Sequence, residues 1–277
     1  MSHYLSIIAA AIIFGSSGVF IKTVHLPVTT LSFFRMVTPF ALMTVLFLFR
    51  KKPFPRFNDK FMILGSFLNA IRMLFYFAGY AYGNISTTVI LLYTWPVFAT
   101  MWGCLFLGER LSLSRLVLFV ATFCGVVLIA LNQSMALSDQ RFIGVVFILL
   151  SAFIYSITIV IFKKKSLRYD PLETLWFQNC LGTFVFLPFL VMNRPFPLAW
   201  QGGLAIVYGC LVGVVGFGLF FSGLRKIEAS RASFLTYIEV VSGIFFGVVF
   251  FEERLSWNII AGGSLVLLSA LALSRKE

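Results

Sequence analysis

Three charged residues stand deep inside long apolar segments of the sequence: Arg35, Arg72 and Glu239. A charge at the centre of a bilayer costs roughly 2.5–3.5 kcal/mol on insertion scales, so such residues usually face protein, water or a ligand. Glu239 lies about ten residues from either end of its predicted helix, or ~15 Å at 1.5 Å per residue. Its carboxylate is too deep to reach the surface. We expect it to bind an ammonium group or exchange a proton, or else to pair with a buried arginine.

Arg72 shares one face of its predicted helix with Asn69 and Tyr76, because residues three and four apart lie on the same side of a helix. A guanidinium group can donate two parallel hydrogen bonds to a carboxylate. The neighbouring amide of Asn69 and phenol of Tyr76 would complete a binding site for it. The alternative is that Arg72 extends to the lipid headgroups. For Arg35, at similar depth, we expect a structural tie to a neighbouring helix, with substrate contact as the alternative.

Aromatic residues accompany the acid. Tyr237 precedes Glu239 by two positions, and Tyr93 and Trp95 have the same spacing in an earlier segment. Trp95 could stack on a substrate cation or pack beside Pro96. The candidate binding residues are therefore Glu239, Arg72, Trp95, Tyr93, Asn69, Tyr76, Tyr237 and Arg35. Weaker candidates for the lining are Tyr80, Tyr82, Tyr155, Ser156 and Thr158.

Long apolar helices must position these residues. Of the 277 residues, 60% are hydrophobic and only 12% are charged, about half the charged fraction of a soluble domain. Apolar runs of about 18 residues or more are long enough to cross a bilayer, and a helix satisfies its own backbone there. We predict an all-α membrane protein with ten transmembrane helices, at about 4–22, 28–50, 59–79, 84–107, 113–132, 141–162, 170–192, 201–223, 229–251 and 257–274.

Basic residues gather in alternate loops, as in "FRKKPFPRFNDK" and "FKKKSLRYD". This bias places both termini in the cytoplasm, and it explains the formal net charge of +12 without nucleic-acid binding. The N-terminus has no basic region and no Ala-x-Ala cleavage site, so we expect its first apolar run to be retained as a helix. The predicted location is the inner (plasma) membrane of a bacterium.

The chain also repeats itself. Without a gap, Tyr93 aligns with Tyr237, Gly103 with Gly247, and Glu109-Arg110-Leu111-Ser112 with Glu253-Arg254-Leu255-Ser256. We therefore predict two five-helix repeats, 1–135 and 136–277. Because five is odd, the two copies must cross the membrane in opposite senses, which would bring the two aromatic segments face to face. Inverted repeats are typical of secondary transporters, whose site lies near the midplane. We expect the repeated turn, with Glu109 and Glu253, to be architectural and near water.

The repeat organisation, the Gly-Glu-Arg-Leu-like turn after the fourth helix, the early Arg35 and Pro96 resemble the EamA-type branch of the drug/metabolite transporter superfamily. In the second repeat, Gln178, Val240 and Glu252 depart from the pattern of Arg35, Pro96 and Gly108. The resemblance covers the whole chain. It implies transport, often export, of amino acids, drugs, nucleotide sugars or other metabolites, and it implies a structural role for Arg35.

Together these features predict a secondary active transporter, an exporter or exchanger, of a small polar metabolite that works by alternating access. An amino-acid-like substrate would place its carboxylate on Arg72 and its ammonium group on Glu239. A cationic or nucleoside-like metabolite such as S-adenosylmethionine is the alternative. We expect a small-molecule substrate and membrane lipid as partners, protons as a candidate coupling ion, and a monomer or homodimer.

A membrane-embedded lipid-modifying enzyme is the alternative of another class. Such enzymes commonly need clustered histidines, acids or metal ligands. His3 and His25 stand near helix ends, and Asp59, Asp139 and Asp170 all fall in predicted loops. No catalytic cluster can be assembled from them at one depth. We therefore expect no catalytic residue, no metal and no cofactor.

Overall fold

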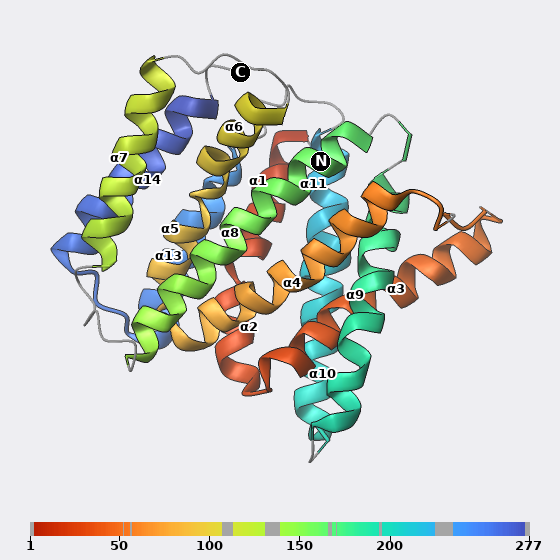
Figure 1. Ribbon diagram of the computed structural model, residues 1–277. Helices are drawn as coiled ribbons and strands as arrows, with labels where there is room; N and C mark the ends of the chain where they lie inside the picture. Colours follow the sequence, from red (N-terminus) through yellow and green to blue (C-terminus); the bar gives the residue numbers. More distant parts are fainter. Residues whose placement is uncertain are drawn as a thin grey trace.

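The computed structural model describes residues 3–51, 53–55, 57–106, 113–130, 139–165, 168–169, 171–193, 196–224 and 235–274. Every regular element in these ranges is a helix (Figure 1), which confirms the all-α prediction. The first elements are α1 (His3–Gly15), α2 (Ser17–Val24), α3 (Val28–Phe49), α4 (Lys60–Tyr82), α5 (Ile85–Leu92), α6 (Trp95–Phe106) and α7 (Leu113–Ala130). They are followed by α8 (Gln140–Lys165), α9 (Pro171–Met192), α10 (Ala199–Tyr208), the π-helix η1 (Gly209–Gly216), α11 (Phe217–Leu224), α13 (Ile238–Phe251) and α14 (Trp257–Ser274).

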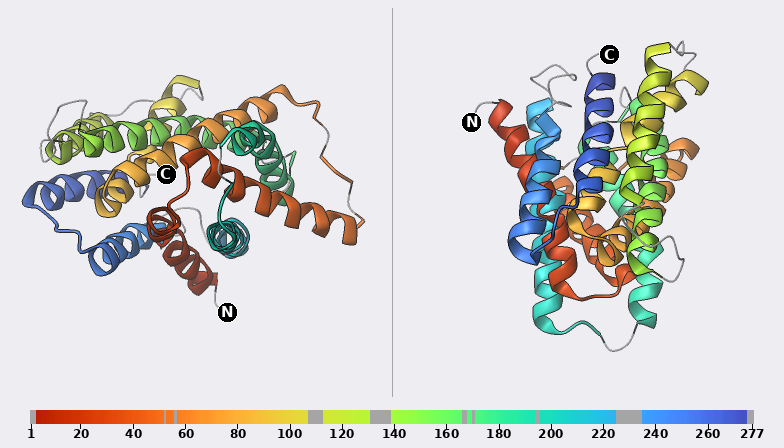
Figure 2. Two further views of the ribbon diagram at one scale, coloured as in Figure 1. Left: turned by 90° about the horizontal axis from the view of Figure 1, so that it is seen from below. Right: turned by 90° about the vertical axis from the view of Figure 1, so that its left-hand side faces the viewer.

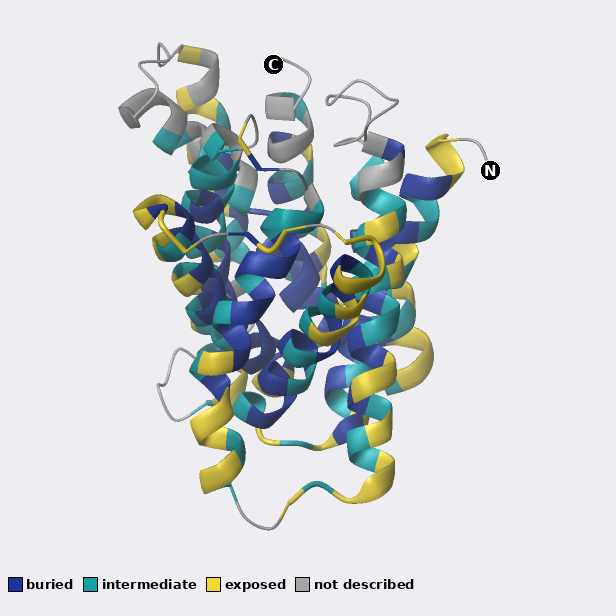
Figure 3. Ribbon diagram, turned by 90° about the vertical axis from the view of Figure 1, so that its right-hand side faces the viewer, coloured by how far each residue is buried: buried dark blue, intermediate teal, exposed yellow. Residues whose placement is uncertain are grey.

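Within the described residues, six helical segments are long and apolar enough to cross a membrane: His3–Val24, Val28–Phe49, Lys60–Tyr82, Gln140–Phe162, Leu172–Met192 and Ala199–Phe220. Four shorter apolar helices are Ile85–Ala99, Leu116–Ile129, Ile238–Phe251 and Trp257–Ser269. Many large apolar side chains are exposed, among them Phe49, Phe123 and Phe245. Exposed stretches of the helices lie on the outer faces of the bundle (Figure 3). Such a surface suits lipid rather than water. The protein is therefore an integral, multi-pass membrane protein.

Helices that are distant in the sequence lie side by side in the bundle (Figures 1 and 2). α4 packs against α8 and α9, α3 against α9, and α7 against α14. Near the centre, α5 contacts α13, and α13 also contacts α1. The start of α1 and the end of α14 lie at the same end of the bundle (Figure 2, right).

Two of the predicted helices are interrupted at matching positions. The helix predicted at 84–107 stops at Leu92 and resumes at Trp95. Pro96 explains this break, because a proline has no N–H group to donate to the carbonyl of the residue four positions earlier, which is Leu92. In the helix predicted at 229–251, a turn at Tyr237 precedes α13. Glu239 was expected in the middle of a continuous helix, and this was wrong: it lies in the first turn of α13.

The segment from α10 to α11 contains η1, whose wide turns are rich in glycine. An added Cβ at Gly213 would lie 2.5 Å from Pro39 Cγ and 2.8 Å from Arg35 Nη1, so only glycine fits there. An added Cβ at Gly209 would lie 2.7 Å from Thr38 Cβ. These glycines let η1 approach α3 closely, as small residues do between membrane helices. The same approach places η1 beside the guanidinium group of Arg35.

Asp59 joins the start of α4 to the end of α8. Its Oδ1 accepts hydrogen bonds from the backbone N–H groups of Phe61 (3.0 Å) and Met62 (3.3 Å), which caps α4. Its Oδ2 lies 2.7 Å from Lys165 Nζ and 3.7 Å from Arg168 Nη1. The hydrogen bond from Lys165, helped by the two backbone donors, lowers the pKa of the Asp59 carboxyl group.

This lowered pKa predicts an acid-sensitive fold. A carboxyl group whose folded pKa is below its unfolded value stabilises the protein at neutral pH, and that stability is lost as pH falls below about 4 toward the folded pKa. We expect Asp59→Asn to lower the unfolding temperature at pH 7 and to have a smaller effect at pH 3.5, as measured by thermal unfolding in detergent. Lys165→Gln should weaken the same pH dependence. An equal loss at both pH values would contradict this role.

Candidate functional site

The carboxylate of Glu239 points into the protein, where it meets Tyr93 at the end of α5. Tyr93 Oη lies 2.9 Å from Glu239 Oε2 and 2.6 Å from the backbone oxygen of Thr236, so its proton is shared between two acceptors. The rings of Tyr93 and Tyr237 pack with their centroids 5.0 Å apart. The expectation that these aromatic segments face each other thus matches the structure. The two interruptions, at Tyr93 and at Tyr237, are therefore in direct contact.

Glu239 lies in the first turn of α13, close to the N-terminus of that helix. The N-terminus of a helix carries a partial positive charge that stabilises a carboxylate by typically 0.3–1 kcal/mol. α1 approaches this turn closely: an added Cβ at Gly15 would lie 2.8 Å from the backbone oxygen of Glu239. α1 itself breaks at Ser16, immediately after that contact. Three interrupted segments thus meet near the start of α13, and interrupted helices are typical of membrane transport sites.

Tyr93 and Tyr237 occupy matching positions but have different hydrogen bonding. Tyr93 Oη has two acceptors, whereas the buried Tyr237 Oη has no hydrogen-bond partner within the described ranges. Removing a hydroxyl that leaves buried acceptors unsatisfied costs about 1–3 kcal/mol, whereas removing an unpartnered one costs little. We expect Tyr93→Phe to destabilise the fold by that amount and Tyr237→Phe to leave its stability within about 0.5 kcal/mol of wild type. The free energy of unfolding of the two purified variants measures this difference. Equal losses of stability in Tyr93→Phe and Tyr237→Phe would contradict the prediction.

Arg72 is buried, with 9% of its surface exposed, so it does not extend to the headgroups. Its guanidinium carbon lies 4.5 Å from the centroid of the Tyr155 ring and 5.5 Å from that of Tyr76. Its Nη2 reaches only the weak acceptor Met73 Sδ, at 3.8 Å, and its Nε has no hydrogen-bond partner among the residues described. Arg72 forms no ion pair with the described carboxylates, although it interacts electrostatically with Glu239 over a longer distance.

The cost of burying the Arg72 guanidinium group, set against what its neighbours contribute, favours a ligand beside it. Contact with an aromatic ring contributes roughly 2 kcal/mol when desolvated, so two rings offset the roughly 2.5–3.5 kcal/mol cost of burial. They do not provide an acceptor for the N–H group of Nε, and a buried donor without an acceptor costs about 1–3 kcal/mol. An acidic group next to Arg72 would recover that cost.

Trp95 packs on the same tyrosine as Arg72. The rings of Trp95 and Tyr155 meet edge to face, with their centroids 5.3 Å apart. Tyr155 therefore connects Trp95 on α6 to Arg72 on α4, and it also interacts electrostatically with Glu239. From its place in the sequence, Tyr155 was only a weaker candidate for the lining of the site. Its importance depends on α8 packing against α4 and α6, which no local pattern announces.

Arg35 is the more deeply buried arginine, with 4% of its surface exposed. Its guanidinium carbon lies 5.6 Å from the centroid of the Phe217 ring, and it makes a polar contact with the Tyr208 hydroxyl. No described carboxylate forms an ion pair with it. The expected tie to a neighbouring helix is present, because Phe217 and Tyr208 flank η1. Tyr208, which sequence analysis missed, is a lone phenol in an apolar run.

The remaining candidates extend the cluster along α4. Asn69 and Tyr76 are both buried on the face that carries Arg72. Tyr76 packs against Tyr80, with ring centroids 4.9 Å apart, and makes a polar contact with Ser17 of α2. All eight predicted residues thus lie in the interior or at its edge, and Glu239, Tyr93 and Tyr237 are in direct contact. In the part of the chain that the structure describes, no group of His, Cys, Asp and Glu side chains could hold a metal ion.

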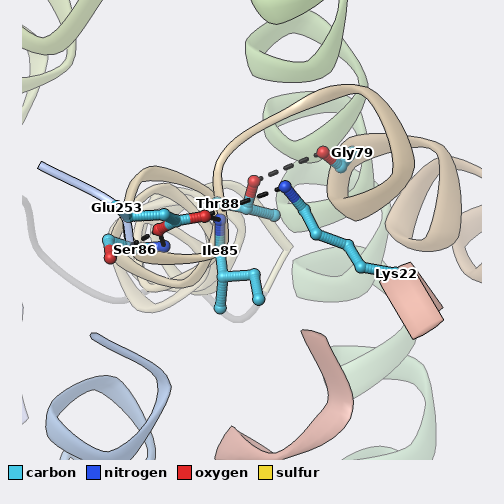
Figure 4. Close-up of polar contacts among 6 residues, drawn as sticks. All are labelled: Lys22, Gly79, Ile85, Ser86, Thr88 and Glu253. Carbon is cyan, nitrogen blue, oxygen red and sulfur yellow. Dashed lines mark hydrogen bonds and ion pairs between the residues drawn. The ribbon is translucent and has the colours of Figure 1, made fainter. Parts of the chain in front are cut away.

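A second polar cluster joins the end of α13 to the start of α5 (Figure 4). Glu253 Oε1 accepts a hydrogen bond from Ile85 N at 2.6 Å, and Oε2 accepts from Ser86 N at 2.9 Å and Ser86 Oγ at 2.8 Å. Lys22 Nζ lies 3.7 Å from Oε1. Only 7% of the Glu253 side chain is exposed, so the expectation that this glutamate lies near water was wrong. Its aligned counterpart, Glu109, lies outside the described residues.

The geometry of the preceding residues explains this burial. Glu252 ends α13 in the left-handed conformation, with φ of 52°, and the N–H group of Glu253 then bonds back to the Gly247 carbonyl at 3.2 Å. A left-handed residue of this kind ends a helix and lets the following N–H group satisfy one of its last carbonyl groups. An added Cβ at Gly247 would lie 2.5 Å from Glu253 Oε2, so glycine provides the room for the carboxylate.

Comparison with known proteins identifies the chain's family. The EamA-like transporter family matches residues 1–131 and again residues 142–275. The chain belongs to this family. It is therefore a transporter and not an enzyme, which confirms the resemblance noted in the sequence.

Several named relatives are similar over most of their length. An uncharacterized transporter of Archaeoglobus fulgidus is 25% identical over 96% of this chain and 94% of its own. The pseudopaline exporter CntI of Pseudomonas aeruginosa is 23% identical over 91% of this chain and 88% of its own. Solute carrier family 35 member G1 of Mus musculus is 22% identical over 95% of this chain and 75% of its own. A solved crystal structure shares the fold, with a TM-score of 0.69 and 15% identity over 99% of this chain and 98% of that chain.

Proposed function

We propose that this transporter carries a small, amino-acid-like metabolite by secondary active transport, as an exporter or exchanger. The observation that carries the proposal is that Arg72 is buried and Glu239 is partly buried beside Tyr93, yet the two charged groups form no ion pair with each other. A molecule with both a carboxylate and an ammonium group would satisfy both. Trp95 and Tyr155 supply apolar surface beside it.

The cationic or nucleoside-like alternative, including an S-adenosylmethionine-like solute, uses Glu239 and the aromatic rings but leaves Arg72 without an acceptor. Two buried arginines against one carboxylate also disfavour a cation, because like charges in a low-dielectric interior repel strongly. The zwitterion is therefore the better supported class.

We further propose that the four shorter apolar helices also span the membrane, which gives ten spans in two inverted halves, 1–135 and 136–277. The two separate matches to one family and the matching interruptions at Tyr93 and Tyr237 support this arrangement. An even number of spans agrees with the start of α1 and the end of α14 at one end of the bundle.

The basic loops favour a cytoplasmic location for both termini, in the inner membrane of a bacterium. The two halves would then alternate in opening toward each side.

A binding screen tests the substrate class. The purified transporter in detergent is heated with single amino acids, nucleosides or amines, since a ligand at 100 times its Kd stabilises the fold by about 2.7 kcal/mol. Amino acids should raise the unfolding temperature, and the same amino acids should exchange across proteoliposomes. Stabilisation by amines or nucleosides alone would overturn the amino-acid proposal.

A pH gradient tests proton coupling. If Glu239 exchanges a proton during the cycle, an imposed gradient across proteoliposomes should drive accumulation of the substrate found in the screen. Exchange without any response to the gradient would identify a facilitated exchanger instead.

A further inference from the structure

The charges of the interior do not balance. Apart from Asp59 and Glu253, which form ion pairs at helix ends, the charged residues within the described transmembrane helices at this level are two arginines, Arg35 and Arg72, and one acid, Glu239. Both guanidinium groups are more than nine-tenths buried, and neither forms an ion pair with a described carboxylate. A zwitterion would bring one positive and one negative charge, so it would leave the excess positive charge unchanged.

The two guanidinium groups border the same polar cluster. Arg35 makes a polar contact with the Tyr208 hydroxyl, and the guanidinium carbon of Arg72 lies 5.5 Å from the centroid of the Tyr76 ring. Ser17 makes polar contacts with both of these phenols, which joins α2, α4 and α10 around one point. Phenols and a serine hydroxyl can donate hydrogen bonds to an acid, but they do not neutralise a buried cation.

We infer that the site accepts a substrate with two acidic groups and one ammonium group, that is, an amino dicarboxylate, with the second acid placed between Arg35 and Arg72. This rests on the proposed amino-acid-like function and narrows it. Tyr76, Tyr208 and Ser17 would donate hydrogen bonds to the second acid. Glu239 would hold the ammonium group, as before. The total charge of the occupied interior is then zero, because the substrate's net charge of −1 offsets the excess arginine.

Glutamate and glutamine are the matched probes, because they differ in shape very little and in one negative charge. We expect glutamate, or its shorter homologue aspartate, to bind the purified transporter at least about tenfold more tightly than the corresponding amide, roughly 1.4 kcal/mol. The measurement is isothermal titration, or thermal shift over a concentration series. Equal affinities, or a preference for the amide, would overturn the inference and leave the amino-acid proposal standing. Binding of none of these probes, with binding of amines instead, would overturn both.

Variants locate the second acid. In Arg35→Gln, the loss of glutamate affinity should exceed the loss of glutamine affinity by about tenfold, and Arg35→Lys should recover part of the difference. Arg141→Gln, which removes an exposed cation at the start of α8, is the control for long-range charge and should keep the wild-type ratio. An unchanged ratio in Arg35→Gln would overturn the placement. If chloride strengthens glutamine binding until it equals that of glutamate, a separate anion supplies the charge, and the dicarboxylate inference is wrong.

Discussion

Replacing Glu239 with Gln should reduce transport by roughly ten- to a hundredfold at low substrate concentration. A hydrogen bond to a charged group contributes about 1.5–3 kcal/mol, and the substitution removes the charge while keeping an oxygen at the same place. Gln can still accept the hydrogen bond from Tyr93, which lies 2.9 Å from the carboxylate, so the fold should persist. Uptake into proteoliposomes under identical gradients measures the loss.

The matched control for this experiment is Glu252→Gln, which removes an exposed acid just beyond the end of α13. Its transport rate should match that of wild type. Thermal unfolding of both variants separates a lost binding group from a lost fold. Unchanged transport in a properly folded Glu239→Gln variant would remove this carboxylate from the mechanism and, with it, the ammonium half of the proposed substrate.

The helices, and the contact between the segments that carry Tyr93 and Glu239, could be predicted from the sequence. The first depend on long apolar runs and the second on the internal repeat. Long apolar runs fix helices in a bilayer, since no other local structure satisfies the backbone there. The gap-free alignment of Tyr93 with Tyr237 predicts that the two segments lie opposite each other. Pro96 also gave a local signal for the break after Leu92.

Other features depend on contacts between distant segments. The turn at Tyr237 has no proline after it, because Val240 stands where the first half has Pro96. The break of α1 at Ser16 likewise has no proline to mark it. Tyr155 and Tyr208 joined the site only through the packing of α8 against α4 and of η1 against α3. A single phenol in an apolar run gives no sign of which helix it will meet.

Loss of the Glu253 carboxylate should cause the largest loss of stability. Glu253→Ala would leave the N–H groups of Ile85 and Ser86 at the start of α5 without their acceptor, and it would leave Lys22 without its partner. Leaving buried donors unsatisfied costs about 1–3 kcal/mol each, so we expect a total of about 3 kcal/mol after partial relaxation. Thermal unfolding of the purified variant measures it. Ser86→Ala, which removes only one of the hydrogen bonds, should cost about 1 kcal/mol.

A double-mutant cycle of Glu253→Ala with Lys22→Met shows whether the ion pair with Lys22 or the hydrogen bonds from the start of α5 contribute more of the stability that Glu253 provides. The Lys22–Glu253 pair is 3.7 Å long and the lysine side chain is 22% exposed, and such partly solvated pairs contribute about 0.2–1 kcal/mol. The coupling between the two substitutions should therefore be under 1 kcal/mol, with most of the Glu253→Ala loss remaining in the Lys22→Met background. A coupling near the full loss would show that the ion pair, and not the capping of α5, holds this end of the bundle together. α5 carries Tyr93 at its other end, so a contact that holds the start of α5 also helps to position the tyrosine that donates a hydrogen bond to Glu239.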